Sequence, residues 1–459
     1  MKKITLIVLM LVSVFGYKVN AQEATVNEKL SEVNDKVNGL TERLATDEAD
    51  LQKLAKIKVS GYIQAQWQNY ENLNTQPSNF FSIRRARVKF TYEAADGVKF
   101  VLQPDFSPGA LALKDAYVVV NDHWTKTFSL WMGKFNRPNY EVEYSSSQRE
   151  LAERSLVIRT LYPGERAVGA KLEYNPVNLP FHLQLALLNG NDGLTIANSA
   201  GVNLNTNENK DIDNYKDIMV RATYNLSLGS FGGLDFGAHG YFGSLKSNAL
   251  NTLSSDYATV SSVKVGDAVK RNWVGGEFQL FADILGGMSL KGEYIAGKNA
   301  TLGYSPAFAT DGTTVTMAGK ANFQNNFAGY YLYFIKNLGK KNQFAFRYDY
   351  YDPNTDITGK DVKVIGYKST DAALASYGSG KSDLATTTFG FALHHYFDDN
   401  IRISLNYDIV QNEKVGSTAG VSNLMENYTK ADGTVVKNGL DYSKNVNNNL
   451  LTLRIQAKF

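Results

Sequence analysis

The chain has 459 residues, with 48 Lys and Arg against 45 Asp and Glu, and a mean hydropathy of −0.28. It contains no cysteine, which excludes a disulfide framework, a thiolate metal site and a cysteine nucleophile. A chain of this length holds two or three soluble domains or one very large barrel. Its 27 Tyr and 24 Phe are abundant for a negative mean hydropathy, and both residue types favour strands.

Residues 1–21 have the pattern of a secretory signal peptide. Two lysines precede an apolar run over residues 4–15, and Val19-Asn20-Ala21 fits a small-residue cleavage site. The apolar run is too short to span a bilayer. We therefore predict cleavage after Ala21. The signal holds three of the 48 basic residues and none of the 45 acids, so the mature chain is neutral overall.

Residues 22–56 differ in pattern from everything that follows. Apolar residues recur at alternating steps of four and three, with charged residues between them, which predicts a periplasmic coiled coil. Asp47 is the one break in this seam, and Gly39 weakens the helix. The alternative is a single amphipathic helix that lies on the protein's own surface. The apolar positions are Val26, Leu30, Val33, Val37, Leu40, Leu44, Leu51 and Leu54.

From Ile57 onward the sequence alternates apolar and polar residues in strands of about ten residues separated by turns. No later window approaches 18 uninterrupted apolar residues, so no membrane-spanning helix is predicted. We predict sixteen strands, an even number as a bacterial single-chain barrel requires. They lie near 57–69, 80–94, 97–106, 111–121, 126–135, 166–174, 180–189, 216–226, 232–243, 270–281, 286–296, 327–337, 341–351, 386–397, 400–411 and 448–459.

The lengths of the connections support a barrel. Connections after even-numbered strands are brief, whereas most of those after odd-numbered strands are long and polar, as in 136–165 and 352–385. Outer-membrane barrels have short periplasmic turns and long outside loops, and a soluble sandwich has no reason for this regularity. We therefore predict an all-β fold, a 16-stranded antiparallel transmembrane β-barrel over 57–459, in the bacterial outer membrane.

The segment FFSIRRARVKF, Phe80 to Phe90, shows where such a barrel places its charged side chains. From Arg85 onward the pattern has period two, so Arg85, Arg87 and Lys89 share one face of the strand. We expect the apolar face to meet lipid and the cations to point into the lumen. Sixteen strands leave an aqueous channel, where Arg and Lys avoid the ~2–4 kcal/mol that the lipid face costs at the midplane.

Strand parity predicts a mixed lumen wall. Segregation of the charges onto opposite walls would create a transverse field, whereas interspersed pairs would mostly neutralise each other. The predicted inward bases are Arg85, Arg87, Lys89, Lys99, Lys171, Arg221, Lys291, Arg347, Arg402, Arg454 and Lys458. The predicted inward acids are Glu93, Asp105, Glu173, Asp217, Asp235, Glu277, Glu293, Asp349 and Asp408.

The motifs FSIRRARVKF, VKFVLQPDF, LKDAYVVV, LWMGKFNRP, SSSQRELAERSLV and PGERAVGAKL follow one another over about residues 57–175. In this order they resemble the phosphate-selective porins O and P. The resemblance implies a trimeric, sixteen-stranded outer-membrane porin, often anion-preferring, that passes small solutes by diffusion through a pore lined by basic residues. The positions that match are Arg85, Arg87 and Lys89 on the second strand, with Arg137, Arg149, Arg154 and Arg159 in the third outside loop.

The third outside loop, residues 136–165, is expected to fold into the barrel and set its bore, as it commonly does in sixteen-stranded porins. One interpretation of its four arginines is an anion-coordinating constriction, because guanidinium groups bind phosphate oxygens in pairs. The other is Arg–Glu pairing that rigidifies the loop, which holds Glu141, Glu143, Glu150, Glu153 and Glu165. SSSQRELAERSLV also predicts a short helix opened by Ser147, with Glu150 completing a capping box.

Catalytic patterns are weak. His394 and His395 are adjacent on a strand and face opposite ways, so they do not share a metal, and His182 and His239 are interpreted as lone lumen residues. We expect no catalytic residue, cofactor, metal or nucleic acid partner. The expected partners are outer-membrane lipid, small anionic solutes and two further copies of the chain. Two alternatives stay open: an outer-membrane hydrolase with a Ser–His pair across the lumen, and a structural or adhesive barrel without conductance.

Overall fold

The computed structural model describes residues 28–48, 50–51, 55–71, 78–107, 111–190, 195–197, 203–205, 211, 213–256, 260–304, 321–362, 381–416, 425–429 and 435–459. The chain divides into two compact units, Met1–Lys58 and Val59–Phe459. The first 27 residues, including the predicted signal peptide, lie outside the described residues.

The N-terminal unit contains a helix over residues 28–48 and 50–51. Lys36 and Glu32 form an i,i+4 ion pair of 2.7 Å on its surface. The helix leaves its apolar seam exposed, as at Leu30 and Leu44, while Val26 and Leu54 lie outside the described residues. A coiled coil therefore stays a prediction. Among the described residues, no helix is both long and apolar enough to cross a membrane.

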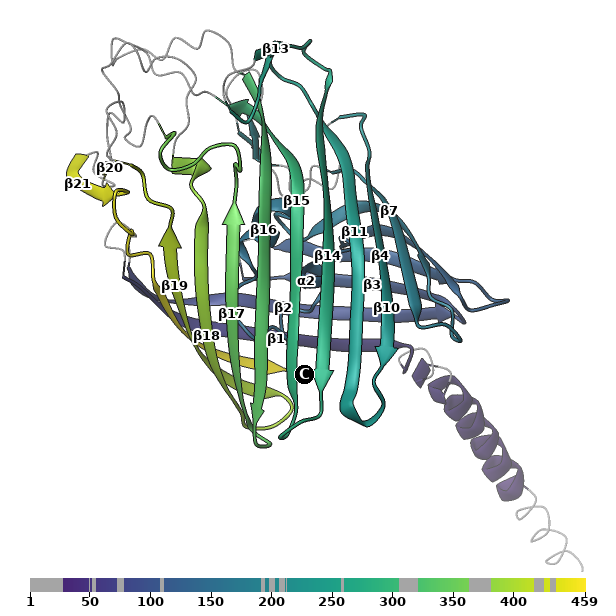
Figure 1. The fold of residues 1–459 in the computed structure, drawn as a ribbon. Coiled ribbons are helices and arrows are strands. Elements are labelled where there is room, and N and C mark those ends of the chain that lie inside the picture. The colour runs from purple at the N-terminus through teal and green to yellow at the C-terminus, as the bar shows by residue number, and fades with distance from the viewer. Residues whose placement is uncertain are drawn as a thin grey trace, which may run out of the picture. The chain divides into compact units, whose positions relative to one another are not determined.

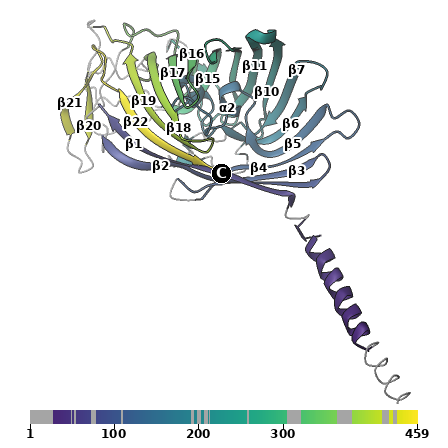
Figure 2. The same ribbon diagram turned by 90° about the horizontal axis from the view of Figure 1, so that it is seen from below.

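The second unit is a closed barrel of sixteen antiparallel strands (Figures 1 and 2). Strand β1 pairs with β22 from Tyr62↔Lys458 to Tyr70↔Leu450, which closes the ring. The strands are β1 (Ile57–Tyr70), β2 (Asn79–Ala95), β3 (Val98–Asp105), β4 (Ala112–Asn121), β5 (Phe128–Asn136), β6 (Arg166–Tyr174), β7 (Phe181–Leu188), β10 (Asp217–Ser227), β11 (Gly232–Lys246), β14 (Ala268–Ala282), β15 (Met288–Tyr304), β16 (Ala321–Leu338), β17 (Asn342–Asp352), β18 (Thr386–Tyr396), β19 (Ile401–Asn412) and β22 (Leu450–Lys458).

All sixteen predicted strands are present, and β15 and β16 extend well beyond the predicted ends. Short elements lie in the connections, all of them in long ones except the helical turn η1 (Gly229–Phe231), which forms the short β10–β11 turn. The others are β8 (Thr195–Ala197) with β9 (Asn203–Asn205), β12 (Asn251–Leu253) with β13 (Val260–Ser262), β20 (Met425–Thr429) with β21 (Val435–Asp441), and the helical turn η3 (Lys381–Asp383). Strand β12 also pairs in parallel with β16 and so joins the main sheet.

The side chains alternate as the sequence predicts. On β22, Leu453 and Ile455 are exposed on the outer face, whereas Thr452, Arg454 and Gln456 are buried on the inner face. In a membrane barrel the outer face meets lipid. The apolar outer and polar inner faces therefore confirm the predicted orientation of the strands.

Strand β2 departs from strict alternation at one residue. Phe81 and Ile83 are exposed on the outer face at odd positions, but further along the strand Phe90 and Tyr92 are exposed at even positions. The parity changes between Ile83 and Arg85. Arg84 and Arg85 therefore both reach inward, where Arg84 contacts Glu153 and Arg85 contacts Gln64.

Short turns join the strands at one end of the barrel. The β2–β3 turn uses Gly97 at φ +74°, a left-handed conformation that glycine adopts without strain. The β4–β5 turn is organised by Asp122, whose carboxylate accepts hydrogen bonds from the backbone N–H groups of Trp124 and Thr125, both at 2.8 Å. The hydroxyl and N–H of Thr125 hold the pKa of Asp122 well below its usual range. The longest fully described connection, between β5 and β6, lies at the other ends of the strands.

Candidate channel constriction

The connection between β5 and β6 folds into the barrel, as predicted, and Figure 2 shows helix α2 inside the ring of strands. Helix α2 (Tyr140–Glu143) begins after Asn139, whose side-chain oxygen accepts a hydrogen bond from the N–H of Val142. The amide nitrogen of Asn139 donates to Glu293 of β15 at 2.5 Å. The hydroxyl of Tyr333 on β16 donates to Glu141 at 2.7 Å. The start of α2 is thus tied to the inner wall at two points.

The predicted helix opened by Ser147 does not form. Residues 147–155 are turns and bends, and helix α3 (Leu156–Leu161) begins only after Ser155. The reason lies in Glu150, which does not cap a helix but accepts from Lys291 at 2.8 Å and from Tyr144 at 3.1 Å. Contacts with the barrel wall therefore override the local capping pattern.

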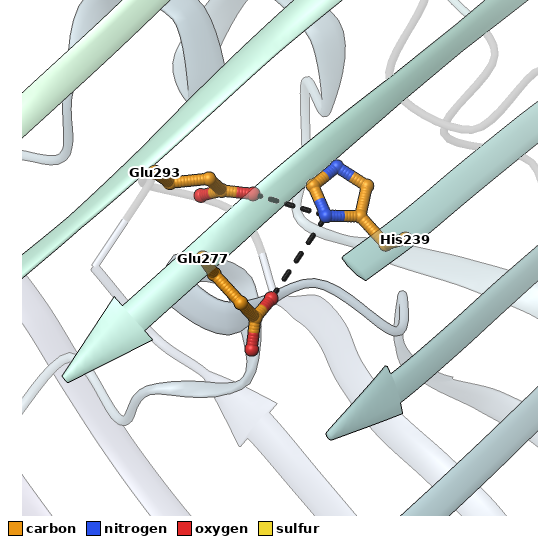
Figure 3. A group of neighbouring side chains, drawn as sticks. All are labelled: His239, Glu277 and Glu293. Atoms are coloured by element: carbon orange, nitrogen blue, oxygen red, sulfur yellow. Dashed lines mark ion pairs between the residues drawn. The ribbon is translucent and has the colours of Figure 1, made fainter. Parts of the chain in front are cut away.

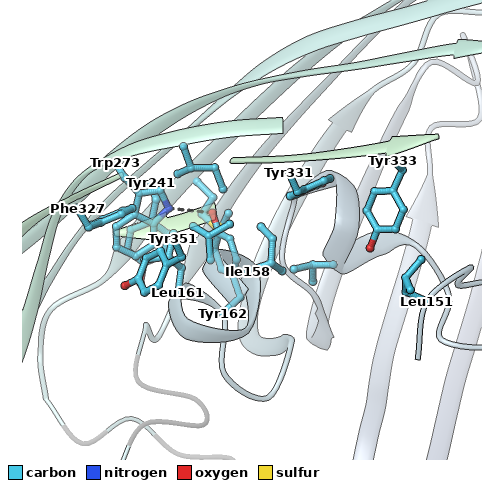
Figure 4. Packing of buried hydrophobic residues seen from close by; sticks show 14 of the residues in the cluster. Leu151, Ile158, Leu161, Tyr162, Tyr241, Trp273, Phe327, Tyr331, Tyr333 and Tyr351 are labelled. Carbon is cyan, nitrogen blue, oxygen red and sulfur yellow. Dashed lines mark hydrogen bonds between the residues drawn. The ribbon is translucent and has the colours of Figure 1, made fainter. Parts of the chain in front are cut away.

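An apolar cluster seats α3 against the wall (Figure 4). The rings of Tyr241 on β11 and Trp273 on β14 stack with centroids 4.0 Å apart, and Trp273 donates to the hydroxyl of Tyr162 at 2.8 Å. Val157 of α3 packs against Gly329 on β16, where a Cβ atom would lie 2.7 Å from the valine side chain. These inward aromatic residues fill the lumen beneath the loop and fix its position.

Glu165 gathers the arginines at the end of the loop. Its carboxylate accepts from Arg149 at 2.9 Å and also pairs with Arg154 and Arg166. The backbone of Glu165 has φ +71°, a strained conformation for a residue with a side chain, and this conformation persists because three arginines hold it. Burial lowers the pKa of Arg149 to about 10, so this guanidinium stays charged at neutral pH.

Two further loop arginines differ in their surroundings. Arg137 is buried and donates to the carbonyl of Pro163 at 3.1 Å. Arg159, in the last turn of α3, is exposed and has no ion pair among the described residues. Arg149 and Arg154 therefore form the Arg–Glu pairs of the interpretation in which pairing rigidifies the loop, whereas Arg159 is open to solvent.

Glu153 forms a second centre of charge within the loop. It accepts from Arg84 at 2.7 and 2.9 Å, and lies 3.7 Å from Arg85 and 3.3 Å from Arg454. Burial alone would raise the pKa of Glu153, but the hydrogen bond and charge of Arg84, with the other arginines, hold it well below its usual range. Three guanidinium groups around one carboxylate leave a net positive charge at this point.

Two of the predicted lumen cations lie beside this centre. Arg85 also donates to Gln64 at 2.8 Å. Arg87 is buried and bonds Asp105 at 2.7 Å and the hydroxyl of Tyr62 at 2.9 Å.

The remaining predicted arginines hold the loop or line open space. Arg221 binds Glu277 in a bidentate pair and reaches Glu143 of α2 at 2.8 Å. Arg347 donates to the backbone carbonyl of Glu153 at 2.7 Å. Arg402 lies 3.4 Å from Gln456 and lines a cavity of about 210 Å³.

The lumen charges are unbalanced on one side of the ring and nearly balanced on the other. Strands β1, β2, β19 and β22 and strands β10, β11, β14 and β15 occupy opposite sides of the ring. We call these the basic wall and the acidic wall. The buried or half-buried charged residues of the basic wall are Arg84, Arg85, Arg87, Lys89, Arg402 and Arg454, against Asp408. Those of the acidic wall are Asp217, Asp235, Glu277 and Glu293, against Arg221, Arg271 and Lys291.

Open space remains next to the basic wall. A cavity of about 360 Å³ lies between the residues after α2 and strands β1 to β4. We call it the basic cavity. Neither Lys89 nor Lys458, which both line it, has an ion pair among the described residues. The charged side chains that line it are Arg87, Lys89, Arg154, Arg166 and Lys458, with Asp115 and Glu143.

The model of the family described as phosphate-selective porin O and P matches residues 57–443, the greater part of the chain. This chain belongs to that porin family. Together with the closed barrel of sixteen strands, membership identifies an outer-membrane channel and indicates a channel rather than an enzyme. No curated protein matches the chain.

Solved porin structures resemble this porin in fold. OprB of Pseudomonas putida at high pH matches with a TM-score of 0.55 at 9% identity, covering 89% of this chain and 96% of that chain. The anion-selective porin from Comamonas acidovorans matches with a TM-score of 0.49 at 11% identity, covering 88% of this chain and 99% of that chain. The trimer form of OmpT from Vibrio cholerae matches with a TM-score of 0.48 at 10% identity, covering 88% of this chain and 99% of that chain. At these identities the likeness concerns the fold alone.

Several residues of the porin's constriction do not follow from strand parity. Arg84 contacts Glu153 in the lumen although its neighbour Arg85 also points inward, so strict alternation along β2 does not predict it. Lys114 is the extra residue where the β3–β4 register shifts, since Gln103 pairs with Asp115 but Pro104 pairs with Leu113. Tyr241, Trp273 and Phe327 stand at inward positions, where polar residues are expected. This feature of the sequence could have indicated where the loop packs against the wall.

Proposed function

We propose that this porin prefers small anions and passes them by diffusion along the basic wall. The observation that carries the proposal is the basic cavity, in which Lys89 and Lys458 have no ion pair among the described residues. Arg85, Arg87, Arg154 and Arg166 lie nearby but already bind carboxylates, so they contribute less net field.

The infolded loop increases the effect of these charges. Of the acids of α2, Glu141 binds Tyr333 of β16 and does not line the basic cavity. Glu143 does line the cavity, but its carboxylate is paired with Arg221. A narrow passage with low-dielectric walls focuses the field of a few fixed charges. An anion in the basic cavity is therefore attracted by the lysines while most of the lumen's acids are held elsewhere.

The wider biological setting is part of the same proposal. Residues 1–21 serve as a signal peptide cleaved after Ala21, and the mature chain forms a homotrimer whose N-terminal helices associate as a coiled coil through their apolar seams. Phosphate and related anions are within the class of solutes. The protein has no enzymatic activity.

The test is single-channel recording of the purified protein in planar bilayers with ion substitution. Replacing chloride by a large organic anion should lower the conductance strongly, whereas replacing potassium by a large organic cation should lower it little. The opposite ranking would overturn the anion preference. A barrel that inserts but carries no current would favour the structural or adhesive alternative, and hydrolysis of phospholipid or peptide by the same preparation would favour the hydrolase.

A further inference from the structure

Three ionisable side chains converge on the acidic wall (Figure 3). They are His239 of β11, Glu277 of β14 and Glu293 of β15. The Nδ1 atom of His239 lies 3.4 Å from a carboxylate oxygen of Glu293 and 3.9 Å from one of Glu277. The prediction that His239 is a lone lumen residue is therefore wrong.

Among the described residues, no hydrogen bond accounts for the buried position of His239. His239 is 4% exposed, and neither ring nitrogen has a hydrogen-bond partner in the described part of the chain. Its ring lies over Gly275, its cross-strand partner, where a Cβ atom would come within 2.3 Å of the ring. The glycine thus leaves room for the imidazole, whose Nδ1 atom points at the two carboxylates.

The two glutamates also lie where their carboxylates repel each other. Glu277 and Glu293 are direct cross-strand partners in the β14–β15 pair. Like charges in this position are destabilising, and removing charges from water adds a further cost. Arg221 offsets Glu277, but it is itself shared with Glu143 of the loop. A cation between Glu277 and Glu293 would remove the repulsion.

We propose that His239, Glu277 and Glu293 bind a divalent transition-metal ion, for which zinc is the best-fitting candidate. One imidazole nitrogen and carboxylate oxygens form a donor set that zinc accepts, with a water completing the tetrahedron. Ligand bonds of about 2.1 Å place tetrahedral donors about 3.4 Å apart, close to the 3.4 Å and 3.9 Å observed here. A neutral imidazole and two carboxylates balance the charge of the ion.

The neighbouring residues orient the ligands as the second layer of a metal site does. The hydroxyl of Tyr331 donates to Glu293 at 2.7 Å, and Asn139 donates to the same carboxylate at 2.5 Å. Because Asn139 caps α2, the metal would join strands β11, β14 and β15 to the start of the constriction loop. The site therefore has a structural role in holding the loop, independent of which ions the channel prefers.

The metal content of the purified protein tests the proposed site directly. The full chain is expressed with zinc supplementation, purified as the folded barrel, passed through chelating resin to remove loosely held ions, and analysed by plasma mass spectrometry. We expect about one zinc per chain in the wild type and a roughly tenfold or greater loss in His239→Gln and Glu293→Gln. His394→Gln is the matched control, since His394 is also a lumen histidine with 4% exposure but bonds Ser404 instead of carboxylates.

A second measurement does not depend on any variant. The wild type is refolded with Co²⁺, and X-ray absorption should show a first shell of nitrogen and oxygen donors with the scattering of one imidazole. Heat-modifiable migration on gels checks that each variant has folded. Wild-type protein without stoichiometric metal after both zinc and cobalt loading would overturn the proposal. Equal metal content in folded His239→Gln and wild type, or a first shell without imidazole, would do the same.

Discussion

Replacing Lys89 and Lys458 together by glutamine should weaken the anion preference with little effect on the barrel. Both side chains line the basic cavity and neither has an ion pair among the described residues, so the double variant leaves no buried carboxylate without its partner. Arg87 is a poor choice for this experiment. It bonds Asp105 at 2.7 Å with both groups buried, and removal of one member of such a pair costs about 3–5 kcal/mol.

The size of the effect follows from the cavity. A sphere of 360 Å³ has a radius of about 4 Å, which places an ion at its centre roughly 6 Å from each ammonium group. At that distance one charge contributes about 0.7 kcal/mol in water, and 0.1 M salt reduces this to roughly half. Two lysines then contribute about 0.7 kcal/mol, a factor of about three in favour of anions and against cations. The ratio of chloride to potassium permeability should therefore fall about tenfold.

The assay is the reversal potential of single channels in a potassium chloride gradient at low mean salt. Lys99→Gln is the control, because Lys99 is an inward lysine of β3 that lies opposite Glu93 and outside the basic cavity. It should leave the permeability ratio nearly unchanged. If Lys99→Gln and the double variant shift the ratio equally, the barrel-wide charge balance governs selectivity and the argument from the basic cavity fails.

Four further outcomes follow from the constriction and the N-terminal helix. Glu165→Gln removes the carboxylate shared by three arginines and should lower the temperature of the heat-induced gel shift, at a cost of about 3 kcal/mol or more; an unchanged temperature contradicts the role of this residue. Trp273→Ala should cost about 3–5 kcal/mol and add noise to single-channel currents, because α3 loses its support, whereas steady currents would show that the cluster does not hold the loop. Because the arginines lower the pKa of Glu153, its contribution to stability is fully present above the ordinary value of 4.5 and is lost as pH falls below it. Glu153→Gln should therefore lower the melting temperature at pH 7 and approach the wild type below about pH 4, and a pH-independent difference would refute this. Deleting residues 22–54 should leave insertion and conductance intact but lower the temperature at which the proposed trimer dissociates, whereas an unchanged temperature would favour a helix on the protein's own surface.

The strands could be predicted because their signal is local. Alternation along β22 and the difference between short and long connections required no knowledge of distant residues, and the sixteen strands appear where the pattern indicates. Resemblance to a porin family then gave the infolded loop. The helix predicted at Ser147 failed because its capping residue, Glu150, binds Lys291, a residue 141 positions away in sequence.

The partners of the site residues could not be predicted, since they depend on how distant strands meet the loop. Glu153 joins Arg84 and Arg454, which is 301 positions away. The excess of bases on the basic wall likewise becomes visible only when the ring closes. His239 came close to Glu277 and Glu293 through the registers of two strand pairs, which depend on the turns between them.

The reversal potential of the wild-type channel, measured in chloride gradients at two mean salt concentrations, tests the central claim most directly. At about 0.1 M salt the sign should show that anions cross more readily than cations. Near 1 M, where the Debye length falls to about 3 Å, the preference should shrink because the lysines of the basic cavity are screened. A cation-selective potential at 0.1 M would contradict the account, since the inward acids would then control the passage.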